Sequence, residues 1–239
     1  MYSMYMALQR CTAKDHSVLG TGSLPKEIAM ITDDMECILP THMMAVHGPR
    51  PVNAPEARTK VTLYPVHSLI LAAHCAKLPA FPPLEVADPV ETPTSQQFTL
   101  PIRPLYLHSP KTFPVILEYL YLRSPDILLQ RLIPLPLPTI MIEKRDQHAS
   151  LARFIGTRLS IPALFFQVSL VHGIWQNTCA LGIFDDVLWG AINFAWKLSV
   201  TSLAVATKKP GVFESYEKYE KQFEMEDETD AEESSEEDK

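Results

Sequence analysis

The chain has 239 residues, of which 46% are apolar and 21% are charged, and this balance excludes a wholly disordered protein. Its 21 prolines against 8 glycines exclude a collagen-like or glycine-rich flexible polymer. The formal net charge is −7, but residues 214–239 alone hold 13 acidic and 3 basic side chains, which leaves 15 acidic and 18 basic side chains in the rest of the chain. That nearly neutral body lacks the basic face that neutralises phosphates, so we expect no direct binding to nucleic acid.

The four cysteines, Cys11, Cys37, Cys75 and Cys179, are scattered and do not have the spacing of a disulfide framework. The first residues also contain no apolar run of signal-peptide length. The sequence therefore predicts a protein of a reducing compartment, the nucleus or the cytoplasm, that is not secreted.

Proline divides the chain into two parts, because 19 of the 21 prolines lie between residues 25 and 138. A proline inside a helix costs about 3 kcal/mol, so long helices are expected only after residue 140. We predict an α+β, mainly α-helical fold in which the two halves pack as one compact unit over about residues 58–210. The predicted parts are an irregular or partly disordered segment over 1–57, a sheet-and-helix half over 58–138, a helical half over 139–211, and a short amphipathic segment with a disordered acidic tail over 212–239.

Hydrophobic periodicity places the elements of the sheet-and-helix half. Pro65 indicates either that the first strand lies at a sheet edge or that the strand ends there, since proline has no N–H for a second neighbour. The predicted elements are, in chain order, a strand over 60–67, a helix over 68–78, a loop over 79–97, a short strand over 98–102, and helices over 112–122 and 124–133.

The helical half is predicted to contain three helices, over 143–159, 162–183 and 185–209. The apolar stripe predicted for the second consists of Leu164, Val168, Val171, Trp175 and Cys179, and all three tryptophans of the chain, Trp175, Trp189 and Trp196, are interpreted as core residues. Asp185 and Asp186 suit the positive end of the third helix, which Pro210 and Gly211 terminate.

Residues 159–184 contain no charged side chain, so a membrane-associated protein that uses residues 160–207 is also allowed. Gln167, His172, Gln176 and Asn177 would then face hydrocarbon, at a cost of about 4–12 kcal/mol if they were left unpaired. We therefore expect a soluble helix pair and keep the membrane as an alternative.

No phosphate-binding glycine loop, nucleophile elbow or zinc-protease motif is present in the sequence. Cys75 follows His74 and lies on the apolar stripe of its helix, which favours a core residue over a nucleophile. The nearest approach to a metal cluster lacks the close ligand pairs of a zinc site. It consists of Cys37, His42 and His47, with His67, His74 and Cys75 further on. We expect no catalytic, cofactor or metal site, and a thiol or metal-dependent enzyme that uses Cys75 or this histidine cluster remains an alternative.

The residues before the acidic tail form a short amphipathic pattern, with Phe213, Tyr216, Tyr219 and Phe223 near one face. This segment is predicted either to pack on its own domain or to dock a protein partner. In the tail, Thr229, Ser234 and Ser235 each have an acidic residue three positions on, the spacing of acidophilic phosphorylation sites. A merely solubilising tail is the alternative.

Two segments resemble a BTB/POZ domain. Residues 65–75 resemble its strand-to-helix element, with His67, Leu71, Ala72 and Cys75 at the matching positions, and residues 113–128 resemble a later helix through Phe113, Leu117, Tyr119 and Tyr121. The resemblance implies a small sheet covered by helices and a surface for protein contacts, and it leaves the oligomeric state open.

Residues 171–196 resemble the clampless-type developmental proteins of basidiomycete fungi. The matching positions are Trp175, Leu181, Gly182, Asp185, Asp186, Leu188 and Trp189. The resemblance implies a non-catalytic regulator downstream of mating-type genes, needed for clamp-cell formation and dikaryon growth, that acts through protein partners such as transcription factors.

Overall fold

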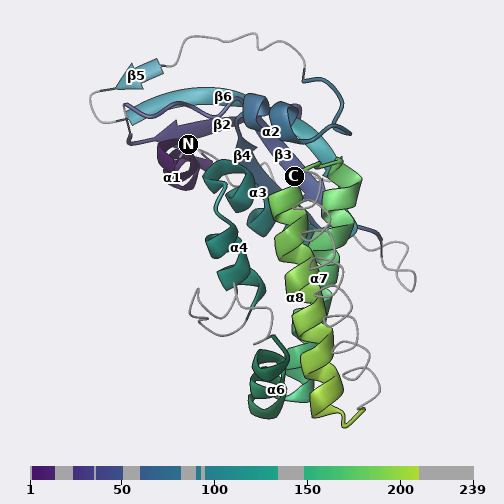
Figure 1. Ribbon diagram of the computed structural model, residues 1–239. Helices are drawn as coiled ribbons and strands as arrows, with labels where there is room; N and C mark the ends of the chain where they lie inside the picture. The colour runs from purple at the N-terminus through teal and green to yellow at the C-terminus, as the bar shows by residue number, and fades with distance from the viewer. Residues whose placement is uncertain are drawn as a thin grey trace, which may run out of the picture. The chain divides into compact units, whose positions relative to one another are not determined.

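The computed structural model describes residues 2–13, 24–34, 36–50, 60–81, 90–92, 95–133 and 148–209 (Figure 1). The chain divides into two compact units. One, here called the sheet unit, consists of Met1–Ser124 and Gly173–Asp185, and the other, the helical unit, consists of Pro125–His172 and Asp186–Lys239. The two units do not follow the predicted halves, because residues 173–185 belong with the first part of the chain, and the predicted boundary at residue 138 lies outside the described residues.

The sheet unit contains the strands and three helices of the chain's first part. The strands are β1 (Thr12–Ala13), β2 (Glu27–Thr32), β3 (His42–His47), β4 (Val61–Val66), β5 (Val90–Thr92) and β6 (Ser95–Tyr106). The helices are α1 (Tyr2–Arg10), α2 (Ser68–His74) and α3 (Phe113–Leu122), and the short 3-10 turn η2 (Pro110–Thr112) leads directly into α3.

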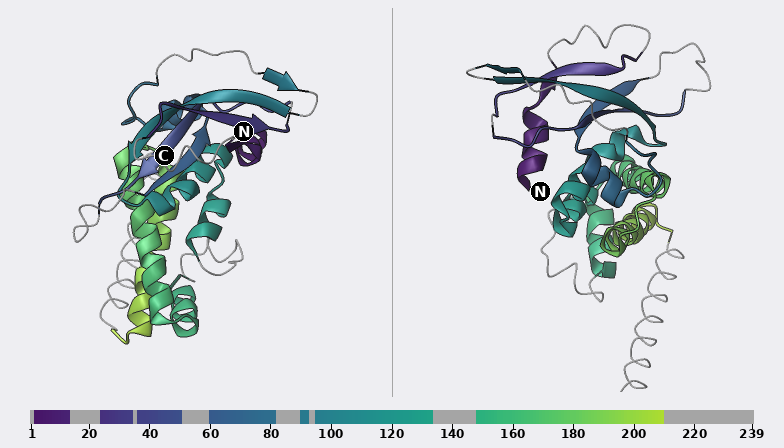
Figure 2. Two further views of the ribbon diagram at one scale, coloured as in Figure 1. Left: turned by 180° about the vertical axis from the view of Figure 1, so that it is seen from behind. Right: turned by 90° about the horizontal axis from the view of Figure 1, so that it is seen from above.

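The six strands form one mixed sheet in the order β1-β2-β6-β3-β4, and β5 also pairs with β6. Figure 2 shows the sheet from behind and from above. β4 lies at an edge, as Pro65 predicts. β6 runs parallel to β3 and antiparallel to β2, and it extends well beyond the short strand predicted over 98–102. The prediction was too short because Pro101 and Pro104 argue against a strand that pairs on both sides. In the sheet, Pro101 pairs only with β2 and Pro104 only with β3, so each proline has a single strand neighbour.

The core of the sheet unit lies on both faces of β3, whose residues from His42 to Val46 are all buried. On one face Met43 and Ala45 join a cluster formed with β2 and β6. On the other face Tyr64, which pairs with Met44 across the strands, packs edge-on against Phe113 of α3, with 5.3 Å between ring centroids. A strand buried on both faces reads as a continuous apolar run and not as an alternating pattern.

Over 1–57, for which an irregular or partly disordered segment is predicted, the described residues contain α1, β1, β2 and β3. β2 has an alternating burial pattern in which Ile28 and Met30 enter the core. Six residues are too few for a strong periodic signal, and the pairing that stabilises β2 comes from β6, which is far away in sequence.

The helical unit contains α4 (Pro125–Leu132), α6 (His148–Arg158), most of α7 (Ile161–Leu181) and α8 (Asp186–Ala206). These bounds fit the helices predicted over 124–133, 143–159, 162–183 and 185–209, and the α+β, mainly helical fold class is confirmed. α6 runs parallel to α8, because His148 contacts Phe194 while Gly156 lies against Ser202 and Val205. None of the described helices has the length and apolar character needed to cross a bilayer.

The buried face of α7 differs from the predicted stripe. It follows Leu164, Gln167, Val171, Ile174 and Leu181, whereas Trp175 is 44% exposed. Trp196 of α8 is also 40% exposed, so the interpretation of these two tryptophans as core residues was wrong. The helix is apolar nearly all round, and its periodicity therefore did not specify which face would be buried.

Candidate functional site

The two segments that resemble a BTB/POZ domain meet at one buried hydroxyl. Tyr121 Oη of α3 accepts the backbone N–H of His67 at 2.8 Å and lies 2.8 Å from His67 Nδ1, to which it donates. His67 Nε2 in turn donates to the carbonyl of Ile38 at 3.0 Å. Burial lowers the pKa of His67, so the neutral ring links three segments of the sheet unit.

We expect Tyr121→Phe to lower the free energy of unfolding at pH 7 by about 2 kcal/mol, because a buried N–H and a ring nitrogen lose their partner. Burial also raises the pKa of Tyr121 to about 12 from its ordinary value near 10. The folded protein then keeps the phenol proton that the unfolded chain releases, so stability is lost as pH rises from 10 to 12. Urea unfolding between pH 10 and pH 12 should show a smaller loss of unfolding free energy in Tyr121→Phe than in the parent protein.

The matched control is Tyr106→Phe, since Tyr106 is 48% exposed on β6. This control should unfold within about 0.5 kcal/mol of the parent protein at pH 7. Equal losses in the two variants would contradict the role assigned to Tyr121.

The end of α7 is held by the chain that follows α2. Gly182 has a φ of +67°, the left-handed conformation that glycine adopts without steric cost, and it terminates α7. The backbone N–H groups of Ala76 and Lys77 donate to the carbonyls of Gly182 and Leu181, each at 3.1 Å. Lys77 Nζ also donates to the carbonyl of Cys179 at 3.0 Å, where a cation suits the negative end of a helix.

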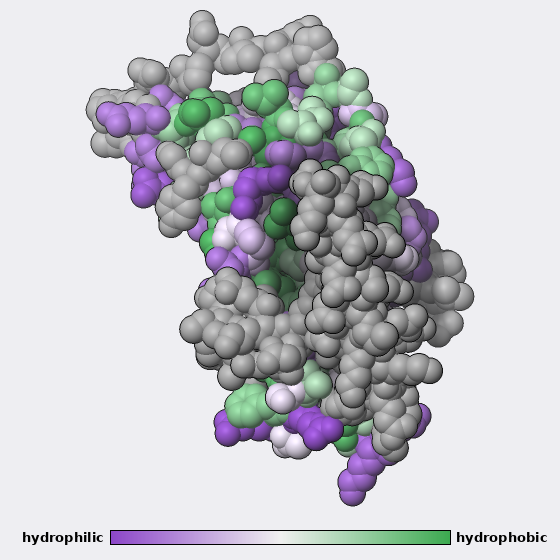
Figure 3. All heavy atoms as spheres, viewed as in Figure 1, coloured by the Kyte–Doolittle hydropathy of each residue, from purple (hydrophilic) through white to green (hydrophobic). Residues whose placement is uncertain are grey.

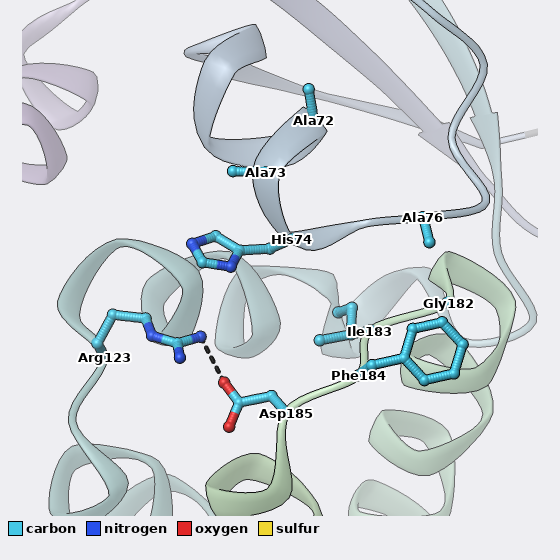
Figure 4. Close-up of a pocket in the computed structure, with 9 residues that line it drawn as sticks. All are labelled: Ala72, Ala73, His74, Ala76, Arg123, Gly182, Ile183, Phe184 and Asp185. Atoms are coloured by element: carbon cyan, nitrogen blue, oxygen red, sulfur yellow. Dashed lines mark ion pairs between the residues drawn. The ribbon is translucent and has the colours of Figure 1, made fainter.

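A pocket of about 190 Å³ opens beside this junction, entirely within the sheet unit. Its lining consists of Ala72, Ala73, His74, Ala76, Arg123, Gly182, Ile183, Phe184 and Asp185 (Figure 4). The volume is below the roughly 300–1,000 Å³ of most small-molecule sites and suits one inserted side chain.

One carboxylate organises the polar side of the pocket. Asp185 Oδ2 forms an ion pair with Arg123 Nη1 and accepts a hydrogen bond from Tyr119 Oη at 3.1 Å. The Asp185 side chain is 7% exposed, whereas that of Arg123 is 36% exposed. The carboxylate is thus bound on one oxygen by two donors, while the guanidinium still reaches solvent.

The conformation of Arg123 places its side chain in this pocket. Arg123 ends α3 in a left-handed conformation, with a φ of 54°, and its backbone N–H donates to the carbonyl of Tyr119 at 2.7 Å. Its guanidinium lies 5.4 Å from the ring centroid of Tyr119. A non-glycine residue in this region is strained, and the ion pair with Asp185 offsets that strain.

Burial shifts the pKa values of two side chains in or beside the pocket. Burial and the neighbouring Arg123 lower the pKa of His74, so its imidazole is neutral at pH 7. Burial and Asp185 raise the pKa of Tyr119 to about 12, so the phenol keeps its proton. Phe184, which is 85% exposed, adds an apolar ring at the edge of the pocket.

Cys75 lies at the end of α2, 2% exposed, as the core interpretation predicts. Burial raises the pKa of its thiol to about 12. A thiol that stays protonated at pH 7 is a poor nucleophile, which disfavours the thiol-enzyme alternative for this residue.

We therefore expect Cys75 to react with iodoacetamide at least tenfold more slowly than Cys179 in the native protein at pH 7.5. Cys179 provides the matched comparison, because it is half-buried in the same unit. Mass spectrometry of quenched samples measures both rates, and urea should make them similar. Fast, selective modification of Cys75 would favour a catalytic thiol instead.

The histidines of the proposed metal cluster have separate environments. His42 Nδ1 lies 3.0 Å from the hydroxyl of Thr41, and its ring packs on Phe81. His47 packs on Tyr106, while His67 binds Tyr121. Over the part of the chain that the structure describes, no group of three or more His, Cys, Asp or Glu residues is arranged to hold a metal ion.

Sequence reasoning missed Arg123 and Phe184 as pocket residues. The ion pair joins Arg123 to a carboxylate 62 positions away, and no local pattern indicates such a pairing. Asp185 does directly precede α8, as predicted, and its carboxylate has the additional role in the pocket. The predicted partner-binding residues Phe213, Tyr216, Tyr219 and Phe223, and the predicted phosphorylation sites Thr229, Ser234 and Ser235, lie outside the described residues.

Comparison with known proteins identifies the family. The model of the clampless protein 1 N-terminal domain matches residues 1–108, and that of the clampless protein 1 C-terminal domain matches residues 126–238. The chain belongs to the clampless protein family.

Clampless protein 1 of Cryptococcus neoformans var. neoformans serotype D is 32% identical over 107 residues, and the same match is found in two strains. The matched region covers 44% of this chain and 21% of that protein, so the chain spans about a fifth of the length of the curated relatives it matches. No solved structure matches the chain significantly.

Proposed function

We propose that this chain is a non-catalytic regulator of clamp-cell formation and dikaryon growth in fungal sexual development, downstream of mating-type genes. Membership of the clampless protein family is the observation that carries the proposal. The regulator acts in the nucleus or the cytoplasm by assembling with other proteins, transcription factors among them.

The pocket of the sheet unit supports a binding role. Asp185, the carboxylate of its described lining, is already bound by Arg123 and Tyr119. Three alanines and the exposed Phe184 provide an apolar wall, and the half-exposed Arg123 provides donors. This combination suits a partner side chain with an apolar stem and an acceptor at its end.

A BTB/POZ-like arrangement is part of the proposal. The hydrogen bonds between His67 and Tyr121 bring together the two segments on which that resemblance rests. α2 and α3 pack on each other beside the sheet, which is the covered-sheet arrangement that the resemblance implies. Domains of this kind present helices for protein contacts.

The proposal is tested in the fungus that encodes this chain, by deleting its gene or replacing it with a variant. Deletion should abolish clamp cells, and Phe184→Asp should reduce their frequency at least fivefold while the protein remains folded and abundant. The matched control is Leu69→Asp, because Leu69 is 74% exposed in the same unit and does not line the pocket. Normal clamp cells in the deletion strain would overturn the proposed function. Equal defects in the two variants would overturn the role of the pocket alone.

A capture experiment tests the partner. The intact chain is compared with the Phe184→Asp variant and with a chain that ends at residue 211, using extracts of mating cells. Proteins that bind the intact chain and the truncated chain, but not the Phe184→Asp variant, would support docking at the pocket. Equal capture by all three would contradict it.

A further inference from the structure

An exposed apolar strip runs along the helical unit. Ile161, Phe165, Val168 and His172 follow one another on α7 at intervals of four, three and four residues, which places them on one face of the helix. Ile161 is 42% exposed and Phe165 56% exposed. The His172 ring lies 6.0 Å from that of Trp196 on α8, which is 40% exposed and completes the strip. We call these five residues the α7 strip.

The α7 strip begins where α8 ends. α7 and α8 are joined by only four residues, Gly182–Asp185, and run antiparallel (Figure 1). Ile161 precedes His172 by 11 residues, and Thr207 follows Trp196 by 11 residues, so both lie about 16 Å from the His172–Trp196 contact in the same direction. The contact of Gly156 with Val205 agrees, since it brings the last turns of α6 and α8 together.

The chain changes direction at that end. Lys208 has a φ of 55°, and the backbone N–H groups of Lys208 and Lys209 donate to the carbonyls of Val205 and Ala204 at 3.1 and 3.0 Å. This pair of hydrogen bonds is a Schellman motif, which terminates a helix and turns the chain away from its axis. Pro210 and Gly211 follow in the sequence, and both residue types disfavour the continuation of a helix.

The next residues match the α7 strip in length and composition. Phe213, Tyr216, Tyr219 and Phe223 recur at intervals of three, three and four residues, and as a helix they span about 15 Å. The strip spans about 16 Å from Ile161 to His172. Since hydrogen bonds to α8 hold Thr207, Lys208 and Lys209, the tether consists of residues 210–212. These three residues reach at most about 10 Å, roughly the distance between two packed helices, so the segment can start beside Ile161 and run along α7.

We propose that residues 213–223 pack within the same molecule on the α7 strip, with their aromatic face against Phe165 and Trp196. The C-terminal family domain includes both partners, since its match extends through residue 238. Covalent attachment through a short tether gives the segment a high effective concentration at the strip. The acidic tail after Phe223 then begins beside the His172–Trp196 end of the strip.

At the surface of α6, hydrophobic and hydrophilic side chains adjoin (Figure 3). There Arg158 stacks over the exposed Phe154, with 4.2 Å between the guanidinium carbon and the ring centroid. This aromatic ring is covered by its own cation, whereas Phe165 has no such cation–π contact among the described residues. The α7 strip is therefore the better docking surface for a second aromatic face.

Hydrogen exchange followed by mass spectrometry tests the proposal on the full chain. The amides of 213–223 should exchange at least tenfold more slowly than in the isolated peptide, and Phe165→Asp should abolish that protection. The matched control is Phe166→Asp, because Phe166 is 71% exposed on the same turn but points away from the α7 strip. Protection of the α8 peptides should remain unchanged in both variants, which shows that the helical unit is still folded.

Three outcomes would overturn the proposal. Peptide-like exchange of 213–223 in the parent protein would show that the segment is not docked. Equal loss of protection in Phe165→Asp and Phe166→Asp would show that the segment does not dock on the α7 strip. Protection that increases with a tenfold rise in protein concentration would show docking on a second copy of the chain, and not within one molecule. None of these readouts depends on the proposed role in clamp formation.

Discussion

Asn177→Ala is expected to lower the free energy of unfolding by about 3 kcal/mol, with hydrogen exchange accelerating in the sheet unit. Asn177 is fully buried on α7, and its amide group makes three hydrogen bonds to the turn before α3. Nδ2 donates to the carbonyl of Ser109 at 2.7 Å and to Thr112 Oγ1 at 2.8 Å, and Oδ1 accepts the backbone N–H of Ser109 at 3.2 Å. Each such bond is worth about 1 kcal/mol.

The adjacent Gln176→Ala provides the control for Asn177, since Gln176 is only half-buried on the same turn of α7. Urea unfolding followed by circular dichroism measures the midpoint, and hydrogen exchange assigns the loss to residues 95–124 and 173–185. A loss of less than 1 kcal/mol for Asn177→Ala would contradict the structural role assigned to this amide.

The second large effect is expected from Gly156→Ala, which should destabilise the helical unit by about 2 kcal/mol. A Cβ at Gly156 would overlap the carbonyl oxygen of Ser202 and lie 2.9 Å from Val205 Cβ. Since the first of these is backbone, α6 and α8 must separate to admit the methyl group. This overpacking outweighs the gain of about 1 kcal/mol that alanine normally brings to a helix over glycine.

The same substitution at Gly190 on α8 is expected to stabilise the protein, because a Cβ at Gly190 meets no atom within 4 Å. Gly190→Ala should therefore stabilise the helical unit by up to about 1 kcal/mol. The two glycines lie in the same unit and undergo the same substitution, so their unfolding free energies should differ by about 3 kcal/mol. Thermal and urea unfolding of both variants measure this difference, and the same sign for both would contradict the close approach of α6 and α8.

The helices after residue 140 could be predicted from sequence because they are long. α6 and α8 repeat their apolar positions over several turns, α7 is a long apolar segment, and Pro162 and the Asp185–Asp186 pair mark helix starts. β4 could be assigned to a sheet edge because proline lacks an N–H. Which face of α7 would be buried could not be predicted, since apolar residues surround that helix nearly evenly.

The N-terminal strands and the pocket depend on contacts between residues far apart in sequence. β2 and β3 pair with β6, about 70 and 60 positions later, and neither is long enough to form alone. Arg123 and Asp185 are 62 positions apart, and Gly182 meets Lys77 across more than 100. Local patterns contain no information about such partners.

The sequence by itself determined the helix content, the edge position of β4, the burial of Cys75 and the family, because each depends on local periodicity, on the chemistry of one residue or on similarity along the chain. Only the tertiary structure decided the division into two units, the exposure of Trp175 and Trp196, and the assembly of Arg123, Tyr119 and Asp185 around one pocket. The physical reason is that the burial of a side chain and its bonding partners depend on the residues within a few ångströms of it in the folded protein. Those neighbouring residues come from distant segments of the chain.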